Sequence, residues 1–138
     1  MLFIKENEKQ EISQKIKEMP QILRNPNVII FIFEGLGTLV LAYGIAVSQY
    51  LHPISRHEPN PYWTFLISCF LYLAISIAAP FTGGHINPSV TIGLMTAGLG
   101  NKSKIGWYIL SQLCGALLGV FICNDISYFR SHFLGNSS

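Results

Sequence analysis

The chain has 138 residues, of which 50% are hydrophobic and only 12% are charged. Average soluble domains carry about 25% charged residues, so this composition favours a polytopic membrane protein over a soluble domain. The net charge of +2 is too small and too scattered for a nucleic-acid-binding protein, and the length leaves room for about three or four membrane elements but no separate soluble domain.

The N-terminal arm, residues 1–27, is polar. Within residues 4–19, Ile12, Ile16 and Met19 recur at helical spacing among Lys and Glu residues. This pattern is typical of a short amphipathic helix on the membrane surface and equally of a solvated helix without lipid contact, and both interpretations stay open.

Three apolar stretches are long enough to cross a membrane as helices. They cover about residues 28–50, 63–79 and 105–123, and Pro80 is expected to end the second. A cleaved signal peptide is rejected for the first stretch, because its apolar run is longer than a signal core and further spans follow.

Pairs of aromatic residues begin the second and third stretches. Tyr62 with Trp63, and Trp107 with Tyr108, are typical of the aromatic belts at membrane interfaces. We therefore expect these side chains near the lipid headgroups.

The distribution of Lys and Arg predicts the orientation. Five basic residues precede the first span, and Lys102 and Lys104 precede the third, whereas the opposite side holds only Arg56 and Arg130. Because basic flanks remain in the cytoplasm, the N-terminus is predicted to be cytoplasmic and the tail, residues 126–138, extracytoplasmic.

The segment GGHINPSV, residues 83–90, predicts a helix start inside the apolar region. Asn87 is a strong N-cap residue, and Pro88 suits the first helical position, where a missing N–H costs nothing. Gly98 predicts the end of this helix, so residues 88–97 would cross only about half of a 30 Å hydrocarbon core. Membranes tolerate such a broken element only where it lines a cavity or packs inside protein, so we expect a re-entrant, site-forming segment.

Three motifs follow one another along the chain: FEGLGT at residues 33–38, GGHINPSVT at 83–91 and SQLCGA at 111–116. In their order and separation they resemble the major intrinsic protein family, the aquaporins and aquaglyceroporins, over about residues 28–125. The resemblance implies an all-α membrane protein, an aquaporin-like half repeat with three transmembrane helices and one re-entrant half-helix. The family fold is an inverted repeat of two such halves, and the second Asn-Pro-Ala loop is missing from this sequence.

The resemblance also implies a set of pore-lining residues. Asn87 would cap the half-helix with its side-chain oxygen and point its amide N–H into the lumen, where this donor and the positive helix end oppose passage of protons and cations. The carbonyls of Gly83, Gly84 and His85 would line the inner half of the pore, since glycine permits close approach of the backbone. The His85 side chain is expected to brace the loop, with a role as ligand or base as the alternative.

Two positions bear on selectivity. In a gapless register, Ile67 falls on the family's second-helix filter position, which favours an apolar wall that is less strictly selective for water. Ser89 stands where the family usually has Ala, and we expect a tolerated small residue, with altered selectivity as the alternative.

Polar and small residues in the spans are predicted to support the loop. Glu34, the only charged residue of the first span, is expected to hydrogen-bond buried N–H groups of the re-entrant segment, with a proton relay as the alternative. Gln112 is expected to act as a polar brace, and Gly115 to allow a tight helix crossing. Ser68 and Ser76 are expected to hydrogen-bond to a neighbouring helix.

The leading functional hypothesis is a passive channel for water or small neutral solutes, of which this chain supplies the first half of the pore. The alternative is a non-conducting membrane subunit that associates with full-length relatives. An enzyme is not expected, because the sequence shows no nucleophile–base pair and no metal-ligand spacing; Cys69, Cys114 and Cys123 are interpreted as small packing residues, and no cofactor or metal is expected. The expected partners are the lipid bilayer, the solute, and a second aquaporin-like repeat or further copies of the chain, a tetramer by the resemblance.

Overall fold

The computed structural model describes residues 20–51 and 61–133, so the helix hypothesis for residues 4–19 lies outside the described residues. Within the described ranges every regular element is helical. The elements are η1 (Gln21–Arg24), α2 (Pro26–Leu51), α3 (Pro61–Thr82), α4 (Pro88–Thr96), η2 (Lys102–Lys104) and α5 (Ile105–Phe133), where η denotes a short 3-10 helix.

Three of these helices, α2, α3 and α5, are long and apolar enough to cross a membrane. The 22 residues of α3, for example, extend about 33 Å, which exceeds a hydrocarbon core of about 30 Å. Helix α4 has only 9 residues and extends about 14 Å. The predicted fold class, an all-α membrane protein with three spans and one half-helix, is confirmed.

The second span does not end at Pro80, contrary to the sequence-based expectation, but continues to Thr82. A proline removes only its own N–H, and the last turn is closed by a bond of 3.1 Å from the N–H of Gly83 to the carbonyl of Ala79. The chain leaves the helix where Gly83 and Gly84 take positive φ angles of 91° and 67°, which glycine adopts at little cost.

The last helix also runs further than the expected span, which ended near Cys123. Helix α5 continues to Phe133, although Asn124 and Asp125 interrupt the apolar stretch. Asn124 and Asp125 end the apolar stretch, but they do not end the helix. No glycine or proline, the residues that most strongly oppose a helix, follows before Phe133.

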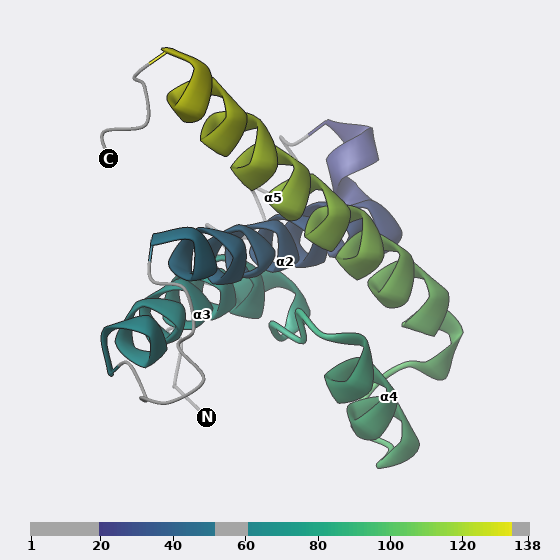
Figure 1. Ribbon diagram of the computed structural model, residues 1–138. Helices are drawn as coiled ribbons and strands as arrows, with labels where there is room; N and C mark the ends of the chain where they lie inside the picture. The colour runs from purple at the N-terminus through teal and green to yellow at the C-terminus, as the bar shows by residue number, and fades with distance from the viewer. Residues whose placement is uncertain (1–19, 52–60, 134–138) are drawn as a thin grey trace, which may run out of the picture.

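Helix α2 lies between α3 and α5, and α4 lies beside the first half of α5 (Figure 1). The crossing of α2 and α5 is close because of small residues. A Cβ placed on Gly115 would collide with the carbonyl oxygen of Gly35, and one on Gly119 would lie 2.5 Å from that of Leu39. The glycine spacing on α5 therefore coincides with the helix contact, and any larger side chain there would push the helices apart.

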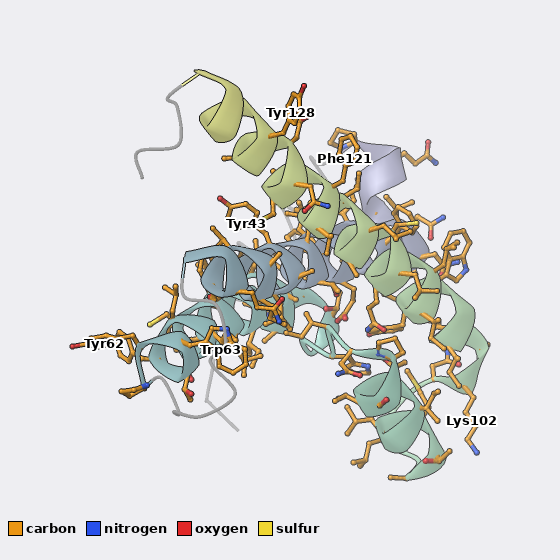
Figure 2. All side chains as sticks on the ribbon, viewed as in Figure 1. Tyr43, Tyr62, Trp63, Lys102, Phe121 and Tyr128 are labelled. Atoms are coloured by element: carbon orange, nitrogen blue, oxygen red, sulfur yellow. The ribbon has the colours of Figure 1, made fainter. Side chains whose placement is uncertain are left out.

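The largest fully buried side chains of the described residues are polar, and many large apolar side chains are exposed. The outer faces carry large apolar side chains such as Phe121, which is 67% exposed and points away from the bundle (Figure 2). This distribution suits lipid as the surrounding medium. The largest fully buried side chains are Gln112, Glu34, Thr91, Ser48 and Ser111.

Two serines of α3 were expected to bond to a neighbouring helix, and this expectation is wrong. Ser68 donates to the carbonyl of Thr64 and Ser76 to that of Tyr72, each at 2.8 Å and within α3. A serine hydroxyl on a helix reaches its own i−4 carbonyl, which satisfies it without a partner helix.

Candidate functional site

The loop between α3 and α4 follows an unusual backbone path. Besides the two glycines that leave α3, Ile86 has a positive φ of 41°. A β-branched residue rarely adopts this conformation, which costs of order 1–3 kcal/mol and persists only where the surroundings fix it.

Ile86 is fixed by contacts on all sides. Its N–H donates to Glu34 Oε2 at 2.7 Å, and its carbonyl accepts from Thr38 Oγ1 at 3.3 Å. Its side chain is buried in a cluster with Ala74 and Ala78 of α3. The strained residue is therefore clamped between α2 and α3.

Glu34 is fully buried and is the main anchor of the loop. Its Oε1 accepts from Thr82 Oγ1 at 2.6 Å and from the N–H of His85 at 3.0 Å. Its Oε2 accepts from the N–H of Ile86 at 2.7 Å and from Gln112 Nε2 at 2.9 Å. One carboxylate thus joins α2 to the end of α3, to the loop and to α5.

Gln112 links this anchor to the half-helix. Its Nε2 donates to Glu34 and, at 3.0 Å, to Thr91 Oγ1 on α4. Its Oε1 is buried and has no hydrogen-bond partner within the described residues. Rotating the amide by half a turn would place this oxygen against the carboxylate of Glu34, so the observed orientation is the one that the anchor favours.

Asn87 caps α4 as the sequence motif predicts. Its backbone is extended, its Oδ1 accepts from the N–H of Ser89 at 2.8 Å, and Pro88 follows at the first helical position. The side chains of Asn87 and Ser89 are exposed. At the other end of α4, the N–H of Gly98 donates to the carbonyl of Met95 at 3.3 Å, and the N–H of Leu99 donates to that of Leu94 at 2.9 Å. Gly98 has a φ of 78°, which is typical of the glycine that ends a helix.

His85 is held in the middle of this arrangement. Its ring stacks on Tyr108 with centroids 4.5 Å apart and an interplanar angle of 21°, and its Nδ1 lies 3.2 Å from Thr91 Oγ1. Tyr108 donates its hydroxyl to the carbonyl of Thr82 at 2.7 Å. Tyr108 is only 7% exposed, and its ring covers the imidazole.

A cavity of about 390 Å³ opens beside His85, between the end of α3, the end of α4 and the starts of α2 and α5. Gly83, His85, Tyr108, Asn101 and Lys104 give it polar groups. The rest of its wall is mainly apolar, from Ile29, Ile30, Phe81, Met95 and Leu99.

The predicted pore-lining residues are only partly brought together. Gly83 and His85 line the cavity, whereas Asn87, Gly84 and Ile67 are not part of its wall. Gly84 lies against Ala79, where an added Cβ would be 3.1 Å from that backbone.

The sequence motifs did not identify Thr91 or Thr82 as site residues. The available signal was spacing, because Thr91 lies four residues after Asn87 and therefore on the same face of the half-helix.

The described residues contain no group of three or more His, Cys, Asp or Glu side chains that could hold a metal ion. Cys69 is exposed, Cys114 partly buried and Cys123 buried, so the packing interpretation does not fit Cys69.

Comparison with known proteins identifies relatives. The family model "Major intrinsic protein" matches residues 25–134. The chain is 30% identical over 99 residues to a "Probable glycerol uptake facilitator protein" of Thermotoga maritima. This match covers 67% of this chain and 42% of the relative. It is 29% identical over 108 residues to "Glycerol uptake facilitator protein 2" of Lactiplantibacillus plantarum, covering 75% and 45%.

A plant relative gives a similar match. The chain is 28% identical over 96 residues to "Probable aquaporin TIP2-2" of Oryza sativa subsp. japonica, covering 70% of this chain and 37% of the relative. The chain thus spans less than half the length of these curated relatives. No solved structure matches it significantly. Since the family model covers most of the sequence, the chain belongs to the major intrinsic protein family.

Proposed function

We propose that this chain supplies the first half of a passive transmembrane channel for water or small neutral solutes. The observation that carries the proposal is the half-helix α4, capped at Asn87 and tied to three apolar helices through the buried carboxylate of Glu34. A helix start inside a membrane protein presents unpaired N–H groups and a partial positive charge. Such an end is tolerated at membrane depth where it lines an aqueous path.

Asn87 is proposed to contact the passing solute. Its Oδ1 is occupied by the N–H of Ser89, so its amide hydrogens are the groups left for a solute, and the side chain is exposed. A donor beside the positive end of α4 orients water and repels cations and protons. Gly83 and His85 would line the wider entrance formed by the cavity.

Glu34 and Gln112 are proposed to brace the loop without taking part in transport. Glu34 is fully buried and accepts four hydrogen bonds, two of them from the backbone of the loop. This arrangement suits a fixed anchor better than a proton relay, which would need a polar path leading away from the carboxylate.

The pore is proposed to need a second, inverted repeat, supplied by another polypeptide or by further sequence. The first half leaves Asn87 and Ser89 exposed, and uncovered polar groups in hydrocarbon cost several kcal/mol each. The alternative is a non-conducting subunit that binds full-length relatives. We further propose that the N-terminus is cytoplasmic, from the excess of basic residues before the first and third spans.

The test uses the chain co-reconstituted in liposomes with the second repeat of a related channel. Asn87→Asp keeps a good N-cap but replaces the amide donor with a negative charge, so water flux should fall and leakage of protons, followed with a pH-sensitive dye, should rise. Asn25→Asp is the matched control, because Asn25 caps α2 in the same way, accepting from the N–H of Asn27 at 3.0 Å before Pro26, and it is not part of the cavity wall. Equal effects of the two substitutions would contradict the proposed role of Asn87.

A further inference from the structure

The hydroxyl of Thr91 lies among three polar partners. It accepts from Gln112 Nε2 at 3.0 Å, it lies 3.1 Å from the carbonyl oxygen of Asn87, and it lies 3.2 Å from His85 Nδ1. Thr91 is fully buried, so no water competes for these positions. All four residues belong to the contact between the loop, α4 and α5.

The hydrogen atoms can be assigned from the chemistry of each partner. A hydroxyl has one hydrogen to donate and two lone pairs to accept with, whereas a carbonyl can only accept and an amide N–H can only donate. All three contacts are hydrogen bonds only if Thr91 donates to Asn87, accepts from Gln112 and accepts from a proton on His85 Nδ1. The other tautomer of His85 would take the single hydrogen of Thr91 and lose the bond to Asn87.

Contacts on the ring and on the backbone restrain His85. Tyr108 stacks on one face of the imidazole at 4.5 Å, and the hydroxyl of Tyr108 is itself held by the carbonyl of Thr82 at 2.7 Å. The backbone N–H of His85 is held by Glu34 at 3.0 Å. These contacts restrain the plane and the position of the imidazole, and a half-turn of the ring would lose the contact between Nδ1 and Thr91.

We infer that Thr91 is a positioning residue that selects, for a neutral His85 imidazole, the tautomer protonated at Nδ1, so that the unprotonated Nε2 is presented to the cavity as a hydrogen-bond acceptor. Nε2 has no hydrogen-bond partner in the described part of the chain, and it lies beside Gly83, with which His85 shares the cavity wall. One extra hydrogen bond of ordinary strength corresponds to roughly a two- to tenfold excess of this tautomer.

The consequence for binding is a preference for hydrogen-bond donors. An acceptor in the wall favours molecules that present O–H groups, such as water or a polyol, over solutes that carry acceptors only. This consequence rests on the proposed channel function, whereas the tautomer itself does not, so the two can be tested apart.

The test is nitrogen NMR of the full chain in lipid bilayers. Replacing His52, His57 and His132 with Asn leaves His85 as the only ¹⁵N-labelled histidine. In alkaline buffer, where an ordinary imidazole is neutral, protonated and unprotonated ring nitrogens resonate in separate ranges. We expect a protonated Nδ1 and an unprotonated Nε2, and the opposite pattern would overturn the inference without bearing on channel function.

Substitutions identify the residue responsible. Thr91→Val keeps the shape but leaves an Nδ1 proton without an acceptor, so the proton should move to Nε2, where the cavity offers water. Thr91→Ser keeps the hydroxyl and should retain the Nδ1 signal. Thr96→Val is the matched control, because Thr96 lies on α4 but bonds only to carbonyls of its own helix. An unchanged spectrum of Thr91→Val, or an equal change in Thr96→Val, would overturn the role of Thr91.

Discussion

Replacing Glu34 with Gln exchanges one acceptor oxygen for a donor at the centre of the re-entrant loop. If the new NH₂ lies where Oε2 was, it faces two donors, Ile86 N–H and Gln112 Nε2. If it lies where Oε1 was, it faces the N–H of His85, while Thr82 can redirect its hydroxyl to the carbonyl of Ala78 at 2.9 Å. The second orientation is therefore the less costly.

The magnitude follows from that orientation. One buried N–H is left without an acceptor, which costs about 1–3 kcal/mol, and the remaining bonds lose the strength that a charged acceptor gives them. We expect Glu34→Gln to destabilise the folded protein by roughly 2–4 kcal/mol. The measured flux of a reconstituted channel should gain no pH dependence, because a brace carries no proton.

The assay is thermal denaturation of the purified protein in detergent, followed by the loss of the monodisperse peak in size-exclusion chromatography. Asp125→Asn is the control, because it makes the same chemical change at an exposed position of α5. Unchanged stability of Glu34→Gln together with an altered pH response of the flux would refute the bracing argument and support a proton relay.

Two further predictions concern packing and orientation. Gly115→Ala should destabilise the protein by about 1–3 kcal/mol, because the added Cβ would collide with the carbonyl of Gly35. Gly106→Ala is the control and should leave the stability unchanged, because a Cβ at Gly106 meets open space. Equal melting temperatures of the two variants would contradict the close crossing of α2 and α5. In a cysteine-free background, a cysteine at Ser55 should react with an impermeant reagent added from outside and one at Ser103 should not, and the reverse pattern would refute the predicted orientation.

The elements of this fold that depend on local chemistry could be predicted from the sequence. The start of α4 at Pro88 and its end before Gly98 follow from a cap and a stop that act over a single turn. The predicted end of α3 at Pro80 is wrong. The positive φ angle at Gly83, and not the proline, ends this helix. Helix α5 continues past the predicted span, because hydropathy indicates which residues lie in lipid and not where a helix ends.

The candidate site depends on contacts between distant segments, and these were only partly predictable. That a buried carboxylate needs donors is general, so hydrogen bonds from the loop to Glu34 could be expected. Which groups donate to Glu34, and that Thr82 and Gln112 are among them, follows only from how α2, the loop and α5 meet. Thr91 was missed because its role requires His85 and Gln112 to approach it from two different elements.

The central claim, that this chain is half of a pore, is tested most directly by osmotic shrinkage of liposomes. Three spans and one half-helix form a wall on one side, and two copies in the same orientation would not supply an inverted partner. Vesicles holding the chain alone should shrink no faster than empty vesicles, and adding an inverted second repeat should accelerate shrinkage. Fast shrinkage with the chain alone, abolished by Asn87→Asp, would contradict the claim and show that copies of the chain supply the missing walls themselves.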